Sequence, residues 1–174
     1  MRRYATTLGV ALAAALAGLA TARGGGPAEP AYLKPADRAM VRQWLAVHPG
    51  YRLAIDADCR CDQDIQRTRK PTDGWPVRPD FHPYFARGDF NHDRHEDIAL
   101  GVHATGERGQ FRVLILSKAA KPYLSDPFLF GDAIFYGPSG RKPYLLLVGP
   151  FEAEVGSLEP LRSGGYRYEP SDCC

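Results

Sequence analysis

Hydrophobic and polar residues follow two different periods along the chain, and the change between them falls near residue 50. Between residues 36 and 48, apolar residues recur every three or four positions, which predicts an amphipathic helix. Pro35 suits the first turn of this helix, and Pro49-Gly50 ends it, because proline cannot continue a helix. The recurring positions are Met40, Val41, Trp44, Leu45 and His48. Trp44 is expected to lie in the core.

From residue 51 onward the period is two, the pattern of half-buried β-strands, and Gly, Pro, Asp and Ser separate most of the runs. The predicted strands are Tyr51–Ala57, Tyr84–Arg87, Asp97–His103, Phe111–Ser117, Phe128–Phe130, Ile134–Tyr136, Tyr144–Val148 and Tyr166–Tyr168. Residues 58–64 are expected to form a turn, and residues 65–83, with four prolines, a long surface excursion. One N-terminal helix followed by short strands predicts an α+β fold, with the helix packed on a mostly antiparallel sheet.

An apolar run at the N-terminus belongs to neither pattern. Arg2 and Arg3 precede the run from Leu8 to Leu19, and Ala20-Thr21-Ala22 follows it, as in a cleavable signal peptide over residues 1–22. The run is shorter than the roughly 20 residues that a membrane-spanning helix needs. Residues 23–31, rich in Gly and Pro, are expected to be a flexible spacer, and residues 32–174 a single domain. The pattern thus predicts a periplasmic or secreted protein with no membrane span after cleavage.

Removal of the predicted signal peptide changes the charge balance. The whole chain has 22 Lys and Arg against 20 Asp and Glu, and residues 1–22 contain two of the basic residues and none of the acidic ones. The exported chain therefore has equal numbers of both signs. A balanced, mixed-sign surface argues against nucleic acid as a partner.

The four cysteines form two clusters, Cys59 with Cys61 and Cys173 with Cys174. Exported proteins commonly form disulfides, and four cysteines allow three pairings. Adjacent residues have Cα atoms about 3.8 Å apart, below the usual disulfide range of about 4.4–6.8 Å. We therefore expect at least one bridge between the clusters, which would tie the C-terminus to the middle of the chain. A four-cysteine zinc site is the alternative, although its spacing departs from the common pattern.

The densest run of metal-ligating side chains lies between residues 88 and 100. Asp89, Asn91, Asp93 and Asp97 occupy positions 1, 3, 5 and 9 of a loop, and the carbonyl of His95 falls at position 7. Hard oxygen ligands at this spacing suit calcium. The apolar run Ile98-Ala99-Leu100 would anchor the loop to the sheet.

This stretch, Gly88 followed by Asp89-x-Asn91-x-Asp93-x-x-x-Asp97 and Ile98-Ala99-Leu100, resembles the calcium loop of FG-GAP/VCBS-type repeats. The resemblance covers about residues 84–101. It implies calcium ligation by the four side chains and a structural role of the metal in an adhesion or binding domain. The chain is also similar to small exported bacterial proteins of unknown function that have one such loop and a late Gly-Pro-Phe-Glu segment, here residues 149–152.

Position 6 of the loop departs from the family, because Arg94 stands where a glycine is usual. A non-glycine residue at positive φ costs on the order of 1–2 kcal/mol, and the guanidinium adds a positive charge near the cation. The expected calcium affinity is therefore weak, with a dissociation constant of roughly 0.1–1 mM. The alternative is a hydrogen-bonded Asx-rich turn without metal.

The acidic residues between 56 and 64 are expected to form a solvated face and not a second cation site.

The sequence lacks the Gly-x-Ser-x-Gly elbow and the Gly-rich phosphate loop of common enzyme classes. It predicts a non-enzymatic exported domain with a structural calcium loop that binds a protein or surface partner. The alternative is a small secreted inhibitor or partner of an envelope enzyme, without metal dependence. Aromatic residues that could anchor such an interface are Trp75, Tyr84, Tyr136 and Tyr144.

Overall fold

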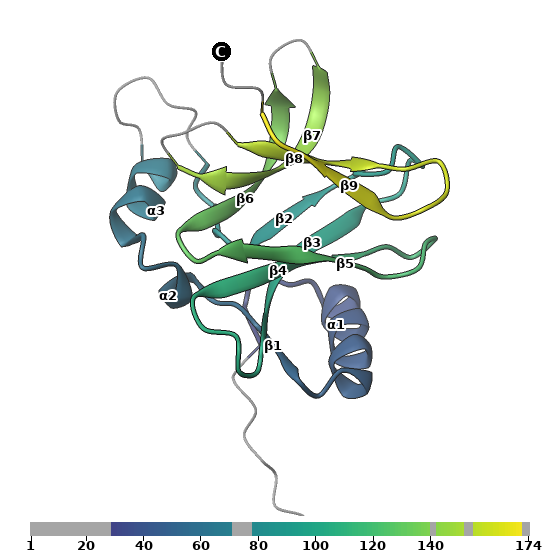
Figure 1. Cartoon of the computed structure of the whole chain (residues 1–174), viewed down its shortest axis with the longest axis horizontal. Coiled ribbons are helices and arrows are strands. Elements are labelled where there is room, and N and C mark those ends of the chain that lie inside the picture. Colours follow the sequence, from purple (N-terminus) through teal and green to yellow (C-terminus); the bar gives the residue numbers. More distant parts are fainter. Residues whose placement is uncertain (1–28, 71–77, 140–141, 152–154, 172–174) are drawn as a thin grey trace, which may run out of the picture.

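A computed structural model of the chain describes residues 29–70, 78–139, 142–151 and 155–171 (Figure 1). The described strands form two antiparallel sheets. Sheet A contains β1 (Tyr51–Leu53), β2 (Phe85–Gly88), β3 (Asp97–Ala104), β4 (Gln110–Leu116) and β5 (Tyr123–Leu129). Sheet B contains β6 (Asp132–Ser139), β7 (Lys142–Pro150), β8 (Gly156–Pro160) and β9 (Tyr166–Glu169). The predicted signal peptide and most of the predicted spacer lie outside the described residues.

The antiparallel pairing confirms the sheet-rich part of the fold prediction, but two sheets replace the one expected. Sheet A has the order β1-β3-β4-β5, and β2 also pairs with β3. Sheet B follows the chain order β6-β7-β8-β9. Strand β8 was not predicted. It is held by its pairing with β7, in which Leu158 lies opposite Leu146.

The structure contains three helices among its described residues, so the prediction of a single helix was wrong. Helix α1 (Pro35–Val47) matches the predicted one within a residue at each end. Helices α2 (Asp56–Cys59) and α3 (Asp62–Arg69) occupy the segment predicted as a strand end, a turn and a surface excursion. Acidic residues in the first turn of α3 and arginines in its last turn complement the helix dipole. This helix buries only Ile65, so its sequence has no apolar stripe to reveal it.

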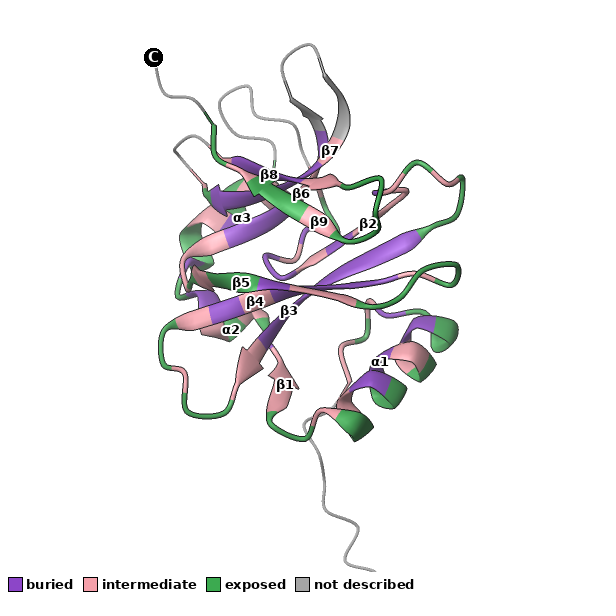
Figure 2. Ribbon diagram, turned by 45° about the vertical axis from the view of Figure 1, so that its right-hand side comes forward, coloured by how far each residue is buried: buried purple, intermediate pink, exposed green. Residues whose placement is uncertain are grey.

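The core has two parts because side chains alternate between the two faces of sheet A. One face packs against α1 in a cluster that contains Leu33, Val41, Trp44, Ile98, Leu100, Val102, Leu114 and Leu116. The other face packs against sheet B in a cluster that includes Ala99, Phe111, Val113, Ile115, Ile134, Leu146, Val148 and Leu158. Strand β3 lies between the two clusters and is buried along most of its length (Figure 2). Trp44 is 6 % exposed, which confirms its predicted place in the core.

A disulfide joins Cys59 to Cys61, which corrects the prediction of a bridge between the two cysteine clusters. Arg60 has a left-handed backbone conformation, with φ of 56°, and it turns the chain so that the two Cα atoms lie 5.1 Å apart. That separation is inside the usual disulfide range. Both sulfurs of this cluster are therefore used, which also removes them from a four-cysteine zinc site. Cys173 and Cys174 lie outside the described residues.

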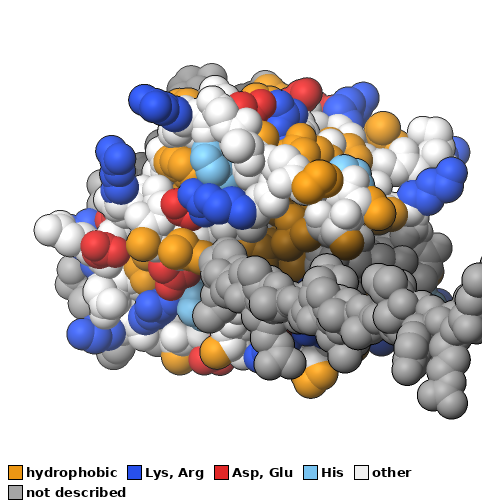
Figure 3. Space-filling view, turned by 90° about the horizontal axis from the view of Figure 1, so that it is seen from below, with side chains coloured by type: hydrophobic (Ala, Val, Ile, Leu, Met, Phe, Trp, Pro, Cys, Tyr) orange, Lys and Arg blue, Asp and Glu red, His pale blue; other side chains and the backbone are white. Residues whose placement is uncertain are grey.

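The surface carries both signs of charge. Seen from below, acidic and basic side chains are interspersed around hydrophobic side chains in the middle of the face (Figure 3). Within the part of the chain that the structure describes, no helix has the length and apolar character needed to cross a membrane.

Candidate metal-binding loop

The candidate loop is the turn of a β-hairpin. Strands β2 and β3 pair in register from Phe85 opposite Leu100 to Gly88 opposite Asp97. Residues 89–96 connect the two paired ends. The apolar strand predicted to anchor the loop is therefore present, and the hairpin brings the first and last predicted ligands to the same end of sheet A.

Side-chain oxygens hold the loop in a tight curl. Asp89 accepts backbone N–H groups from Asp93 at 3.0 Å and from Arg94 at 2.9 Å. Asn91 accepts the same Asp93 N–H at 3.0 Å, and Asp93 accepts the N–H of His95 at 2.8 Å. The amide of Asn91 also donates to the Asp93 carboxylate at 3.0 Å. The structure thus brings together the predicted residues at positions 1, 3 and 5, whereas the side chain of His95 is exposed.

The backbone of the loop turns through positive φ at two non-glycine residues, His92 with φ of 62° and Arg94 with φ of 69°. Arg94 is the position at which the family resemblance implies a glycine. Its left-handed conformation confirms that the chain makes this turn without one. The energetic penalty, on the order of 1–2 kcal/mol, is offset by the hydrogen bonds around it.

Asp97 closes the loop from inside the protein and is fully buried, with 0 % exposure. One carboxylate oxygen accepts the N–H of Phe90 at 3.1 Å, but Oδ1 has no hydrogen-bond partner of normal geometry. Burial raises the pKa of Asp97, and hydrogen bonding with Ser117 and with the Phe90 N–H opposes this rise. The negative charges of Asp93 and Asp89 raise the pKa further. A buried carboxylate with an unused oxygen is the chemistry that a cation would complete.

The described residues contain no group of three or more His, Cys, Asp or Glu side chains arranged to hold a metal ion. The carboxylates of Asp89, Asp93 and Asp97 are therefore not gathered around a common point as a metal-binding group in this structure. They accept backbone N–H groups, as the alternative of an Asx-rich turn predicts. Carboxylate, amide and carbonyl oxygens, including the unused Asp97 oxygen, are ligand types that fit calcium. To bind the ion, the carboxylate oxygens of Asp89 and Asp93 would give up the backbone N–H groups that they now accept.

Tyr136 of sheet B packs on the loop, a contact that the sequence did not indicate. Its hydroxyl donates to the carbonyl of Asp89 at 3.2 Å, and its ring meets Phe90 with centroids 5.1 Å apart. Gly88 lies directly against the ring, because a Cβ at this position would be 2.1 Å from a ring carbon. The family resemblance gave Gly88 no role beyond preceding the loop. Here it allows the loop to lie against sheet B.

An ion network links the loop to the start of α1. Glu96, the residue before Asp97, pairs with Arg87 at 2.8 Å and with Lys34 at 2.8 Å. Arg87 also pairs with Asp37, which is 5 % exposed and lies in the first turn of α1. Hydrogen bonding to Lys34 is the largest influence on the Glu96 carboxyl and lowers its pKa. Glu96 therefore connects the end of the loop to the start of α1 through Lys34 and Arg87.

The other polar residues considered in the sequence take part in structural contacts. Asp58 pairs with Arg52 at 2.8 Å, and Asp56 pairs with Arg69 at 2.7 Å. Asp56 also bonds to the ring of His82 at 3.0 Å. Asp56 and Asp58 are thus partly buried, and each is paired with an arginine.

Among the aromatic residues named as interface anchors, Tyr84 is buried with 1 % exposure and cannot serve as one. Tyr136, on β6 of sheet B, is half-buried against the loop. The side chains of Trp75 and Tyr144 lie outside the described residues. The alternative of an aromatic interface therefore loses one of its four anchors.

Comparisons of the chain with protein-family models, with curated proteins and with solved structures found no match.

Proposed function

We propose that the protein is an exported, non-enzymatic binding domain, periplasmic or secreted, whose loop 88–100 takes up calcium weakly as a structural ion. The ligands are the side chains of Asp89, Asn91, Asp93 and Asp97, together with the backbone carbonyl of His95. Calcium bound there would neutralise the carboxylates of Asp89 and Asp93 in the turn and of Asp97 at the start of β3.

The observation that carries the proposal is Oδ1 of the fully buried Asp97, which has no hydrogen-bond partner of normal geometry. An unsatisfied buried polar atom costs about 1–3 kcal/mol, and more when it is charged. Proteins rarely keep such a group without a use. Asp89 and Asp93 add negative charge near this oxygen. A hard cation would offset both the repulsion between these carboxylates and the solvation that Asp97 loses on burial.

The loop has two contacts through which an ion would organise the surface around it. Tyr136 joins the loop to sheet B, and Glu96 joins it to Lys34 and Arg87 near the start of α1. A cation that fixes the loop would therefore fix sheet B and α1 relative to the hairpin. We propose that this rigid arrangement presents the surface that a protein partner binds.

A calorimetric titration with calcium tests the proposal. The expected result is one site per chain with a dissociation constant of roughly 0.1–1 mM, in the range of extracellular calcium modules. The variant Asp93→Ala is expected to show no heat of binding. The matched control is Asp126→Ala, which removes an exposed carboxylate on β5 and is expected to bind like the wild type. Equal binding by both variants would contradict the assignment of the loop.

A further inference from the structure

The turn between α2 and α3 contains the one disulfide among the described residues, and the ring that this disulfide closes is very short. Cys59 ends α2, Cys61 directly precedes α3, and only Arg60 lies between them. In the chain-entropy model, the stabilisation by a disulfide grows with the length of the closed loop. This bridge therefore stabilises the fold much less than a bridge across the domain would.

The oxidised turn holds its middle residue in an unfavourable conformation. Arg60 has φ of 56°, in the left-handed region where the chain at a helix end commonly has a glycine. The Arg60 side chain is exposed and forms no ion pair or hydrogen bond with the other described residues. No polar contact of the guanidinium thus offsets the backbone penalty, and opening of the disulfide would free Arg60 to leave this conformation.

The surroundings of Cys61 favour its thiolate form. Cys61 is the N-cap residue of α3, at the positive end of the helix dipole, and it follows the unpaired Arg60. Asp62 and Asp64 in the first turn of α3 oppose this effect. Cys61 is 8 % exposed and Cys59 is 3 % exposed, so Cys61 is the more accessible of the two sulfurs. A stabilised thiolate also leaves a mixed disulfide more readily.

We propose that the Cys59–Cys61 disulfide is redox-active, so that a thiol reductant opens it in the folded protein and the left-handed turn at Arg60 is released. One thiolate of the reductant attacks Sγ of Cys61, the S–S bond breaks, and Cys59 leaves as a thiolate. A second thiolate attacks the reductant sulfur of the mixed disulfide and releases the Cys61 thiolate. Two electrons pass to the protein, its two sulfurs take up two protons, and the two reductant thiols become one disulfide.

Reduction is expected to loosen α2 and α3 and to leave the two sheets folded. Helices as short as these are marginal without tertiary contacts, and α3 buries only Ile65. The opening does not depend on calcium in the loop, so each of the two proposals can fail without the other.

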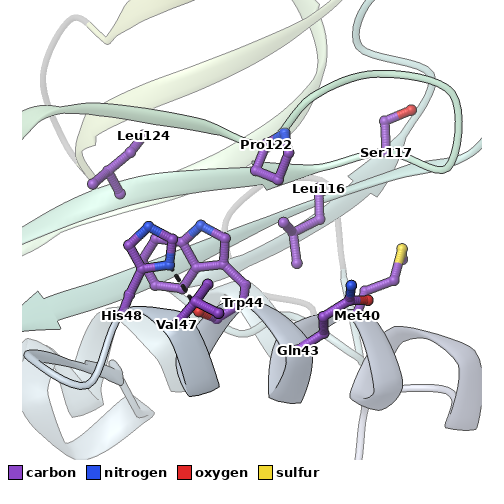
Figure 4. A pocket seen from close by; sticks show the side chains of 9 residues that line it. All are labelled: Met40, Gln43, Trp44, Val47, His48, Leu116, Ser117, Pro122 and Leu124. Atoms are coloured by element: carbon purple, nitrogen blue, oxygen red, sulfur yellow. Dashed lines mark hydrogen bonds between the residues drawn. The ribbon is translucent and has the colours of Figure 1, made fainter.

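Trp44 reports the state of the fold independently of the disulfide. It belongs to the core cluster between sheet A and α1, whereas Cys59 and Cys61 belong to the cluster between the two sheets. The indole of Trp44 lines a groove between α1 and β5, where it stacks on the ring of His48 with centroids 4.1 Å apart (Figure 4). In a Trp75→Phe background, Trp44 is the only tryptophan of the chain.

The test places the exported protein, folded and in chelator, in about 10 mM reduced and about 0.1 mM oxidised glutathione, in which structural disulfides stay oxidised. Alkylation and mass spectrometry read Cys59 and Cys61 in the tryptic peptides that end at Arg60 and Arg67. The expected result is alkylation of both cysteines in at least about a third of the molecules, with native Trp44 emission. Cysteines that react only after urea has unfolded the protein would overturn the proposal.

Variants test the contribution of the turn. Arg60→Gly is expected to shift the equilibrium toward the disulfide by about five- to thirtyfold, because glycine adopts positive φ without penalty. The matched control is Arg94→Gly, which replaces the other described arginine at positive φ and is expected to leave this equilibrium unchanged. No shift in Arg60→Gly, or an equal shift in the control, would overturn the proposal.

Hydrogen exchange tests the release of the turn. Amides of residues 56–69 are expected to exchange faster in the reduced protein than in the oxidised protein, while exchange in β3 stays the same. Equal exchange of residues 56–69 in the two redox states would contradict the release.

Discussion

Replacement of Asp97 by asparagine separates the metal role of this carboxylate from its structural role. Asparagine keeps an oxygen that can accept the Phe90 N–H, which now reaches the carboxylate at 3.1 Å. It removes the charge from a site with 0 % exposure, where Oδ1 has no partner. The expected effect differs in sign between chelator and calcium, because the charge costs energy only while no cation is bound.

The magnitudes follow from the environment of Asp97. In chelator, loss of the buried charge is expected to raise the free energy of unfolding by about 1 kcal/mol. In about 10 mM calcium, the wild type gains roughly 1.4–2.7 kcal/mol by mass action if the dissociation constant is about 0.1–1 mM. The variant is expected to gain none of this. Calcium therefore reverses the order of stability of the two proteins.

Urea denaturation of both proteins, with chelator and with calcium, measures this reversal. Asp93→Ala serves as a second variant that removes a ligand from the exposed side of the loop. The reasoning is refuted if Asp97→Asn lowers the free energy of unfolding by the same amount in both solutions. That outcome would mean that the carboxylate supports the turn without a metal.

Three further changes test individual parts of the structure. Arg94→Gly relieves a residue at φ of 69°, so stability in chelator is expected to rise by about 1 kcal/mol and calorimetric calcium affinity to increase; unchanged affinity would contradict the strain argument. Burial raises the pKa of Asp58, but hydrogen bonding with Arg52 and with the Ile55 N–H outweighs it, so the pKa is lowered overall. The Arg52 pair therefore stabilises the fold above the ordinary carboxyl pKa, and this stabilisation is lost as pH falls through the lowered pKa. Asp58→Asn should therefore cost about 1 kcal/mol at pH 7 and progressively less as pH falls through the lowered pKa of Asp58 in urea titrations, and a constant difference would be inconsistent with the pair. Gly88→Ala is expected to cost about 1–3 kcal/mol through collision with Tyr136, and the loss should shrink in a Tyr136→Leu background; strictly additive losses would rule out the contact.

Local sequence patterns predicted the elements that depend on local contacts. Helix α1 is found within one residue of its predicted ends, because its apolar stripe and its proline and glycine boundaries are all in the segment itself. Strands β3 and β4 were predicted because each contains a short apolar run bounded by turn residues, and the structure buries these runs on both faces of the sheet. Strand β8 escaped prediction because Leu158 is its only large apolar residue, and its pairing with β7 supplies the rest.

In the candidate site, too, the local features were predicted from the sequence and the contacts made through tertiary packing were not. The spacing predicted that Asp89, Asn91 and Asp93 lie within one turn. The family resemblance implied positive φ at Arg94, which the structure shows together with positive φ at His92. Neither could indicate Tyr136, which is 47 residues from Asp89 and reaches the loop only through the packing of the two sheets. The complete burial of Asp97 likewise depends on tertiary packing.

The disulfide was wrongly predicted for a geometric reason. Adjacent cysteines are too close together to form an unstrained bridge, but cysteines two residues apart are not. At Cys59 and Cys61 the separation is 5.1 Å, because Arg60 takes up a left-handed conformation. Helices α2 and α3, which flank this turn, hold the two cysteines in place.

The most direct measurement of the central claim is the melting temperature of the exported chain, with chelator and with about 10 mM calcium. A stabilisation of roughly 1.4–2.7 kcal/mol corresponds to a rise of about 3–10 °C for a domain of this size. We predict a rise in this range that is absent in Asp93→Ala. An unchanged melting temperature, or an equal rise in the variant, would contradict a calcium site in the loop.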